Sequence, residues 1–380
     1  MISTKFAIPD IIFGSGSITH LAECAKRVGA QKIFFVSDSG VEESGWVDLV
    51  KGILRANNLE CVYFNDVNSN PRDRQVHSGA KQYLEARCDV IIALGGGSAM
   101  DTAKGIGIIA GNGGQIRDYE GANRIMRPLP PMILIPSTAG SSSDISQFCI
   151  ITDVEREVKM SIISRSLVPN ISIIDPQLLI TQSRSLILAA GIDALAHAVE
   201  SYVSKLASPF TEMQALKAIE LIINNIKPAA EDRDLKALEQ MSIASTAAGM
   251  SFSNAGLGSL HALAHSLGGI CDVLHGWVHP VLLPEVMRYN LPSCVGKMGE
   301  IGRIISGSHI CSTKEAAVLG IDCLEKLFVE LGINTRLRDL VPEKETLKKI
   351  CVTATHDACH LTNPRPATWE DLMTICEEAW

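Results

Sequence analysis

The feature that most constrains the fold is a continuous apolar run at residues 89–94 that ends in the loop Gly95-Gly96-Gly97-Ser98. Helical periodicity resumes at 99–110, so this glycine loop joins a buried strand to a helix. Three other strand-like runs lie at residues 32–37, 61–64 and 132–135, and helical periodicity at 41–57 separates the first two. Strands that are apolar on both faces and alternate with helices are typical of a parallel sheet with helices on both sides.

The pattern changes in the second half of the chain. Two strand-like segments, 148–152 and 159–163, flank a charged turn at 153–157 and predict a hairpin. From residue 183 onward helical periodicity dominates, at 189–205, 210–226, 233–250, 258–268, 312–331 and 344–358. The sequence therefore predicts an α/β domain at 1–181 and an all-helical domain at 182–380.

Composition excludes several classes of protein. The length of 380 residues leaves room for roughly two domains, and the net charge of −8 offers no basic surface for a nucleic acid. No run approaches the ~18 apolar residues of a membrane span, and the first residues lack the pattern of a secretory signal. The eleven cysteines are scattered without a Cys-x-x-Cys motif, which favours free thiols in the reducing cytoplasm over a disulfide framework.

The glycine loop is a candidate phosphate site. Glycines let the backbone approach a phosphate closely, and the N-terminus of the following helix supplies free N–H groups. The loop is not the G-x-G-x-x-G fingerprint, because residue 100 is Met, and no Gly-Lys-Ser/Thr follows as in a P-loop. The alternative is a tight strand-to-helix turn in which Ser98 caps the helix.

Two further strand ends carry polar side chains. The segment 136–144, which contains Ser137, Thr138 and Ser141, could donate hydrogen bonds to a phosphate or a ribose, or it could only cap the next segment. Asp38 follows the first clear strand, where a carboxylate can accept hydrogen bonds from ribose hydroxyls. A strand-end Asp is, however, more often a turn or cap residue.

Acidic and histidine side chains gather on apolar segments of the helical half. Asp193 and His197 are four residues apart, as are His261 and His265, so each pair shares one face of a helix. His275 follows beyond a pair of glycines that can end the second helix. Oxygen and imidazole donors without a thiolate predict a buried divalent-metal site for Fe²⁺ or Zn²⁺, with Mn²⁺ or Co²⁺ as alternatives.

The remaining histidines carry weaker signals. His279, in Trp277-Val278-His279-Pro280, could belong to the outer shell of the metal site, but a core or surface position is the favoured interpretation. The others have no such grouping and are interpreted as structural; they are His20, His77, His309, His356 and His360.

Several motifs together resemble those of the iron-containing (group III) alcohol dehydrogenases, over almost the whole chain. They are Phe13-Gly14-Ser15-Gly16, Gly95-Gly96-Gly97-Ser98-x-x-Asp101, Pro136-Ser137-Thr138-Ala139-Gly140, Gly191-Ile192-Asp193-Ala194-Leu195-x-His197-Ala198-x-Glu200, His261-Ala262-x-Ala264-His265-x-Leu267-Gly268 with His275-Gly276, and Thr362-Asn363-Pro364-Arg365. Within that family the chain is most similar to the propanediol, lactaldehyde, ethanol and methanol dehydrogenases.

The resemblance implies a Rossmann-like α/β nucleotide-binding domain and an all-α metal-binding domain, with the active site in the cleft between them. The metal, Fe²⁺ before Zn²⁺, would be held by Asp193, His197, His261 and His275. His265 matches a family histidine that lines the site without binding the metal, and it is the candidate catalytic residue, as a proton relay. The resemblance also implies a homodimer or a larger assembly of dimers.

The implied cofactor is NAD. The matching positions are Asp38, Asn70, Gly96, Gly97, Ser98, Ser137, Thr138, Ser141, Phe148 and Lys159. Among them, the glycine loop would hold the pyrophosphate and Asp38 the adenosine ribose. A carboxylate at Asp38 repels a 2′-phosphate, so NAD is expected rather than NADP.

Several positions depart from the commonest family pattern. Ser137, Ser141 and Asp144 stand where Thr, Thr and Glu are usual, and these changes keep hydroxyl and carboxylate chemistry. Ala99 replaces a frequent Pro. His279 stands where Asn is common, a change that could alter substrate preference or add a competing metal ligand.

The expected activity is reversible hydride transfer between a small primary alcohol or diol and its aldehyde, with NAD as acceptor and the metal as Lewis acid. The alternative is an NAD- and metal-dependent lyase, or a polyol dehydrogenase, of the same fold. Relatives such as dehydroquinate synthases bind a phosphorylated substrate with Lys and Arg near the metal. The segments around Asp193 and His261 are apolar instead, which favours a small neutral alcohol.

Overall fold

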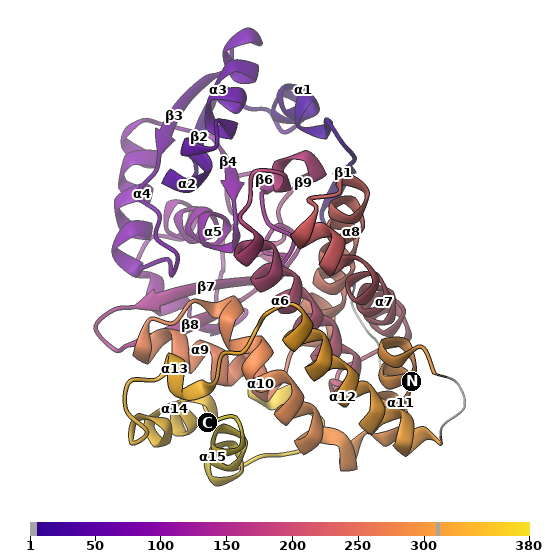
Figure 1. The fold of residues 1–380 in the computed structure, drawn as a ribbon. Coiled ribbons are helices and arrows are strands. Elements are labelled where there is room, and N and C mark those ends of the chain that lie inside the picture. The colour runs from indigo at the N-terminus through magenta and orange to yellow at the C-terminus, as the bar shows by residue number, and fades with distance from the viewer. Residues whose placement is uncertain (1–5, 309–311) are drawn as a thin grey trace.

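The computed structural model describes residues 6–308 and 312–380, so His309 lies outside the described residues. An α/β part, coloured indigo to magenta in Figure 1, is stacked on a part built from helices, coloured mainly orange to yellow. The helix α6 (Arg184–Val203) lies where the two parts meet (Figure 1). The predicted fold class, an α/β domain followed by a helical one, is confirmed.

The α/β part is organised around a six-stranded sheet in the order β1-β9-β6-β4-β2-β3. All of its strand pairs are parallel, as the doubly apolar runs predicted. Its strands are β1 (Asp10–Phe13), β2 (Lys32–Val36), β3 (Glu60–Phe64), β4 (Val90–Gly95), β6 (Met132–Pro136) and β9 (Ile171–Ile174).

Helices cover both faces of this sheet. Along β2, Phe34 and Val36 enter one buried cluster while Ile33 and Phe35 enter another, because successive side chains of a strand point to opposite faces. The helices of this part are α1 (Leu21–Arg27), α2 (Ser39–Glu43), α3 (Trp46–Ala56), α4 (Asp73–Glu85) and α5 (Gly97–Asn112). α4 and α5 pack on the first face, and α1 and α3 pack on the second.

A smaller sheet in the order β5-β8-β7 links the two parts. Its strands are β5 (Gly121–Ala122), β7 (Phe148–Asp153) and β8 (Val158–Ile163). β7 and β8 form the predicted antiparallel hairpin. β7 contacts α5 and β8 contacts α9 (Ser259–Cys271), so the hairpin lies between the α/β part and the helical part (Figure 1).

The helical part has one large apolar core, and half of the residues of α6 belong to it. The 20-residue α6 is apolar enough to cross a membrane by length and composition, but 89% of its apolar window is buried inside the protein, as expected of a core helix. The other helices are α7 (Pro209–Glu231), α8 (Leu235–Ala255), α10 (His275–Asn290), α11 (Val295–Ser306), α12 (Thr313–Glu330), α13 (Leu337–Leu340), α14 (Thr346–Ala354) and α15 (Trp369–Glu378).

The segment 41–57 is helical as predicted, but it forms two helices, α2 and α3, because Gly45 takes the left-handed conformation (φ +85°) between them. One prediction about a helix end was wrong. The glycines Gly268 and Gly269 do not end α9, which continues to Cys271 before Asp272 adopts φ +53°. These positions lack side chains because β8 packs closely against the helix. A Cβ on Gly269 would lie 2.7 Å from the carbonyl oxygen of Glu157.

Candidate active site

The three polar loops of the sequence follow neighbouring strands of the sheet. Asp38 follows β2, the glycine loop follows β4, and the 136–144 loop follows β6, so all three lie at the carboxyl edge. The chain reverses its direction across the sheet between β2 and β4, the position where open α/β sheets bind ligands. A cavity of about 640 Å³ opens there, and it is lined by Asp38, Gly96, Gly97, Ser98, Ser137, Thr138 and Ser141.

The geometry of the glycine loop suits an anion. Gly96 is the N-cap of α5 and provides no side-chain cap, so N–H groups at the helix start stay free. The interpretation of Ser98 as N-cap was wrong, and its hydroxyl instead donates to the carbonyl oxygen of Ser69. A Cβ on Gly97 would lie 2.8 Å from Oγ of Ser141, so only a glycine leaves this narrow passage open.

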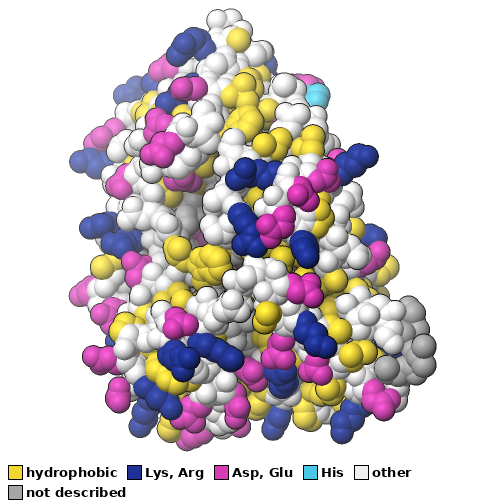
Figure 2. Space-filling view, in the orientation of Figure 1, with side chains coloured by type: hydrophobic (Ala, Val, Ile, Leu, Met, Phe, Trp, Pro, Cys, Tyr) yellow, Lys and Arg dark blue, Asp and Glu magenta, His cyan; other side chains and the backbone are white. Residues whose placement is uncertain are grey.

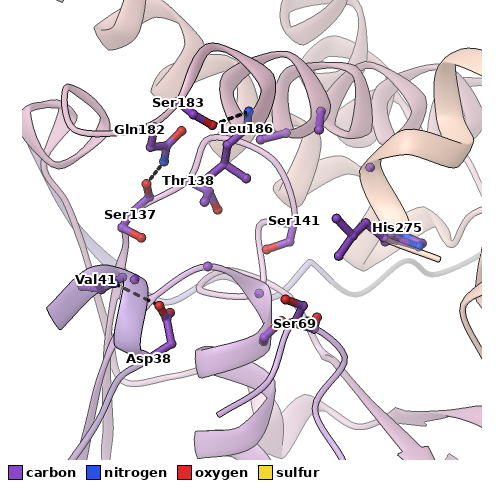
Figure 3. A pocket seen from close by; sticks show the side chains of 18 of the residues that line it. Asp38, Val41, Ser69, Ser137, Thr138, Ser141, Gln182, Ser183, Leu186 and His275 are labelled. Atoms are coloured by element: carbon purple, nitrogen blue, oxygen red, sulfur yellow. Dashed lines mark hydrogen bonds between the residues drawn. The ribbon is translucent and has the colours of Figure 1, made fainter. Parts of the chain in front are cut away.

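Asp38 both caps a helix and lines the cavity. Its Oδ1 accepts a hydrogen bond from the backbone N–H of Val41 at 3.0 Å, at the start of α2. Burial raises the pKa of this carboxyl. In Figure 3, Asp38 lies on one side of the cavity and His275 on the other, with Ser69 and Ser141 between them.

A second cavity, of about 190 Å³, adjoins the first and holds the remaining predicted cofactor residues, Asn70, Phe148 and Lys159. Nδ2 of Asn70 donates to Oδ1 of Asp272 at 2.6 Å, which joins the α/β part to the end of α9. Burial lowers the pKa of Lys159 to about 8, against the attraction of Asp272, Asp101 and Asp193.

The metal candidates converge around one oxygen, Oδ1 of Asp193. The nearest nitrogens of four imidazoles surround it at 3.4–3.9 Å; they belong to His197, His261, His275 and His279. Asp193 and His197 come from α6, His261 from α9, and the other two from α10. A Cβ on Gly276 would lie 2.9 Å from Ala189, so this glycine lets α10 approach α6 closely enough for its histidines to reach Asp193.

The donor atoms of this cluster fit a bound cation. Among the described residues, Oδ1 of Asp193, Nε2 of His261 and Nδ1 of His279 are buried without a hydrogen-bond partner, and each of these nitrogens is the one nearest Asp193. In His197 and His275 the unpartnered nitrogen is Nδ1, whereas Nε2 is the nitrogen nearest Asp193. Buried polar atoms without partners are rare, since each costs about 1–3 kcal/mol. Asp193, His261, His275 and His279 each offer an atom within 4.8 Å of the others, close to the ~4.4 Å that separates two opposite ligands of one ion. His197 is near Asp193 but does not join this mutually close set.

A carboxylate that the sequence argument gave no role orients His261. Oε2 of Glu200 accepts a hydrogen bond from Nδ1 of His261 at 2.6 Å, and its Oε1 accepts from the backbone N–H of Leu260 at 2.8 Å. Nε2 of His261 is thereby directed at Asp193. Burial opposes charge on this imidazole, but Asp193 and Glu200 together raise its pKa to about 9. In the sequence, Glu200 was a carboxylate in a mostly apolar segment and the last residue of a family motif, but no role was assigned to it.

His265 is held in the same way by a second carboxylate that was missed. Its Nδ1 donates to Oδ2 of Asp357 at 2.9 Å, and Oδ1 of Asp357 accepts from the backbone N–H of Cys359. Although burial opposes it, His265 keeps the pKa of Asp357 below its usual range. His265 lines the smaller cavity beside His261, so it faces the reaction space without pointing at Asp193. Nothing in the local sequence pairs residue 265 with residue 357.

The histidines interpreted as structural lie apart from this cluster where the structure describes them. His77 accepts a hydrogen bond from the backbone N–H of Ile116, and His360 bonds Ser259 and Ala367. His356 bonds the carbonyl oxygen of Val352, and His20 lies 3.7 Å from Glu23.

Fold and site together define a class. A parallel α/β domain with a glycine loop at its switch point, opening onto buried carboxylate and imidazole donors of a helical domain, is the arrangement of a nucleotide- and metal-dependent oxidoreductase.

Comparison with known proteins identifies the family within this class. Residues 9–176 match the model of the iron-containing alcohol dehydrogenases, and residues 187–380 match that of the C-terminal part of the Fe-containing alcohol dehydrogenase family. The chain belongs to the iron-containing alcohol dehydrogenase family, as the motifs predicted, and it is an oxidoreductase that acts on alcohols.

Individual relatives cover the whole chain. It is 37% identical to a 1,3-propanediol dehydrogenase of Citrobacter freundii, over 99% of this chain and 98% of that protein. It is 34% identical to an NAD-dependent methanol dehydrogenase of Bacillus methanolicus, over 99% of this chain and all of that one. Among solved structures, a 1,3-propanediol oxidoreductase superposes with a TM-score of 0.96 at 36% identity, over the full length of both chains. The lyase alternative is not favoured by these relatives.

Proposed function

We propose that the protein is an NAD-linked, metal-dependent dehydrogenase that interconverts a small primary alcohol or diol and its aldehyde. The observation that carries the proposal is that the two cavities are continuous. They share six lining residues, which are Ser69, Gly97, Ser98, Ser141, Asp193 and His275. A nucleotide whose pyrophosphate rests on the glycine loop would therefore bring its nicotinamide toward the donors around Asp193.

The residues of the larger cavity would bind and orient the cofactor. The start of α5, with Gly96, Gly97 and Ser98, would hold the pyrophosphate through free N–H groups and the helix dipole. Ser137, Thr138 and Ser141 would donate hydrogen bonds from the opposite wall. Asp38 would accept hydrogen bonds from the adenosine ribose, and its charge favours NAD over NADP.

The residues of the smaller cavity would hold the metal and the alcohol. Asp193, His197, His261 and His275 are the proposed ligands, and a divalent metal bound there, Fe²⁺ before Zn²⁺, supplies Lewis-acid polarisation of an oxygen. The volume of about 190 Å³ and the apolar walls Phe148, Phe252 and Leu257 favour a small substrate. The named relatives act on propanediol and methanol, which supports this size class.

His265 is the proposed proton relay. Oδ2 of Asp357 accepts a hydrogen bond from Nδ1 of His265, which fixes the tautomer and leaves Nε2 free to take a proton from the alcohol side of the cavity. This dyad orients the imidazole without contact to Asp193.

Three broader properties belong to the same proposal. We place the domain division at 1–181 and 182–380, in agreement with a last strand that ends at Ile174 and a helix that begins at Arg184. We place the protein in the cytoplasm, because the ten described cysteines are free. Two buried thiols, Cys351 and Cys376, form a hydrogen bond of 3.8 Å between their Sγ atoms but no disulfide. We expect a homodimer or an assembly of dimers.

We expect no nucleic-acid or membrane partner. In support of this, acidic and basic side chains are interspersed over the face shown in Figure 2, so that face carries no uniformly basic surface.

The test is NADH formation with a panel of short alcohols and diols, on protein loaded with Fe²⁺ or Zn²⁺, and again after treatment with a chelator. We expect turnover that the chelator abolishes and the metal restores. Absence of turnover with every alcohol and aldehyde of the panel would refute the proposal.

A further inference from the structure

We propose that His279 is a fifth protein donor to the metal, in addition to Asp193, His197, His261 and His275. The inference rests on the proposed metal site and adds a ligand to it. His279 lies on α10 one turn after His275, so both imidazoles project from the same face of the helix.

The first argument is geometric. Nδ1 of His279 lies 3.4 Å from Oδ1 of Asp193, the shortest of the four imidazole distances to that oxygen. Two donors that each lie about 2.0–2.2 Å from one metal ion are no more than about 4.4 Å apart, so this separation suits a shared ion. The ring centres of His261 and His275 are 4.7 and 4.6 Å from that of His279. His279 is also one of the four residues whose donor atoms are all mutually close.

The second argument excludes a packing role. His279 is 0% exposed, yet neither of its ring nitrogens has a hydrogen-bond partner among the residues that the structure describes. A buried histidine of a protein core is normally bonded through at least one nitrogen, as His261 is to Glu200 and His265 is to Asp357. An imidazole that keeps two unsatisfied nitrogens beside a carboxylate fits a cation ligand better than it fits an apolar core.

The third argument excludes an outer-shell role. Outer-shell residues hydrogen-bond the second nitrogen of a ligating histidine, and Glu200 does this for His261. His279 makes no hydrogen bond to any of the other ligands. His279 therefore lies beside the position that the metal would occupy between the donors, and not behind another ligand.

A fifth donor changes which ion the site prefers. Zn²⁺ is commonly four-coordinate, and its catalytic sites use three protein ligands and one open position. Five protein donors exceed that number, whereas Fe²⁺ and Co²⁺ accept six and would keep one position open. His279 should therefore reduce the advantage that Zn²⁺ has over these ions at nitrogen-rich sites.

The experiment compares metal binding by the full-length wild type, His279→Asn and His279→Leu. Dissociation constants for Co²⁺ and Zn²⁺ come from competition with a chromophoric chelator, and the visible spectrum of the Co²⁺ protein reports the coordination number. His77→Asn serves as the matched control, since His77 is a half-buried histidine bonded only to a backbone N–H remote from the site. His261→Asn serves as the positive control for loss of a ligand.

In both His279 variants we expect Co²⁺ binding to weaken by about 100-fold and Zn²⁺ binding by about tenfold or less, a range typical of changes at a metal site. The Co²⁺ bands should also intensify, because they do so as coordination number falls. Unchanged affinities and spectra in His279→Asn, with a loss in His261→Asn, would overturn the fifth ligand and leave the proposed function standing. If the wild type binds neither metal, the metal site and the fifth ligand fall together. Should His279→Leu fail to fold, His279→Asn gives the same readouts.

Discussion

Glu200→Gln is the perturbation that most directly tests how the metal pocket is oriented. The buried carboxylate accepts two hydrogen bonds, from Nδ1 of His261 at 2.6 Å and from the N–H of Leu260 at 2.8 Å. A glutamine keeps the size but can accept with only one of its two terminal atoms. If its oxygen accepts from Leu260, its amide faces Nδ1, and His261 must carry its proton on Nε2, the atom directed at Asp193.

The magnitude follows from that mismatch. To bind a metal through Nε2, His261 must keep its proton on Nδ1, and this N–H then faces the amide N–H₂ of the glutamine. A buried donor that faces another donor costs about 1–3 kcal/mol, equivalent to roughly 5- to 150-fold in an equilibrium constant. Outer-shell changes at metal sites have effects of about 10- to 100-fold. We therefore expect Glu200→Gln to weaken Co²⁺ or Zn²⁺ binding by about 10- to 100-fold in a chelator competition at pH 7. Glu300→Gln is the control, because Glu300 accepts a hydrogen bond from Tyr202 and neither residue lines the two cavities.

The pH dependence gives the same test a second readout. The pKa of His261 is raised from 6.5 to about 9 in the folded protein, and metal binding requires its neutral form. Apparent affinity should thus rise by about tenfold per pH unit from 7 to 9, and less steeply in Glu200→Gln, where the pKa is lower. In the metal-free protein the same shift stabilises the fold by about 3 kcal/mol below pH 6.5, and this is lost as pH rises through 9. An unchanged affinity together with an unchanged slope would refute the role of Glu200.

Three other changes probe the cofactor and the relay. Asp357→Asn should lower kcat by about 10²-fold or more with little effect on KM, and should alter the pH profile of kcat, because His265 loses its fixed tautomer; a profile identical to the wild type would contradict the relay. Gly97→Ala places a Cβ 2.8 Å from Oγ of Ser141, so NADH binding measured by fluorescence should weaken by about tenfold or more, about 1.4 kcal/mol; tight binding would show that the passage can widen. Asp38→Gly should improve kcat/KM for NADP relative to NAD, and a constant ratio would remove Asp38 from the ribose.

The parts of the site that the sequence predicted in the α/β half share one property, which is that each is local. A buried strand followed by a polar loop can be recognised within ten residues, and parallel strands bring such loops to one edge of the sheet. Asp38, the glycine loop and the 136–144 loop were therefore expected, and they line one cavity. The predicted hairpin at 148–163 is equally local, because its two strands are joined by a short charged turn.

The parts that the sequence did not predict depend on contacts between distant segments. Glu200 meets His261 across 61 positions, and Asp357 meets His265 across 92, so no periodicity within a helix relates them. Gly268 and Gly269 looked like a helix end for the same reason. Both positions need a glycine because β8 packs against α9 too closely for any side chain, and β8 lies about a hundred residues earlier in the chain.

The two histidines of α9 had looked equivalent, and the structure explains why they differ. Both lie on the same face, but Glu200 on α6 turns His261 toward Asp193, while Asp357, next to the 3₁₀ turn Ala358–Thr362, holds His265 at the cavity wall. His275 and His279 form a third pair with the same spacing of four. His279 was interpreted as a core or surface residue, and the two prolines that follow it, Pro280 and Pro284, normally interrupt a helix. α10 nevertheless runs through both prolines, so His279 stays on the face of His275 and reaches the donors around Asp193.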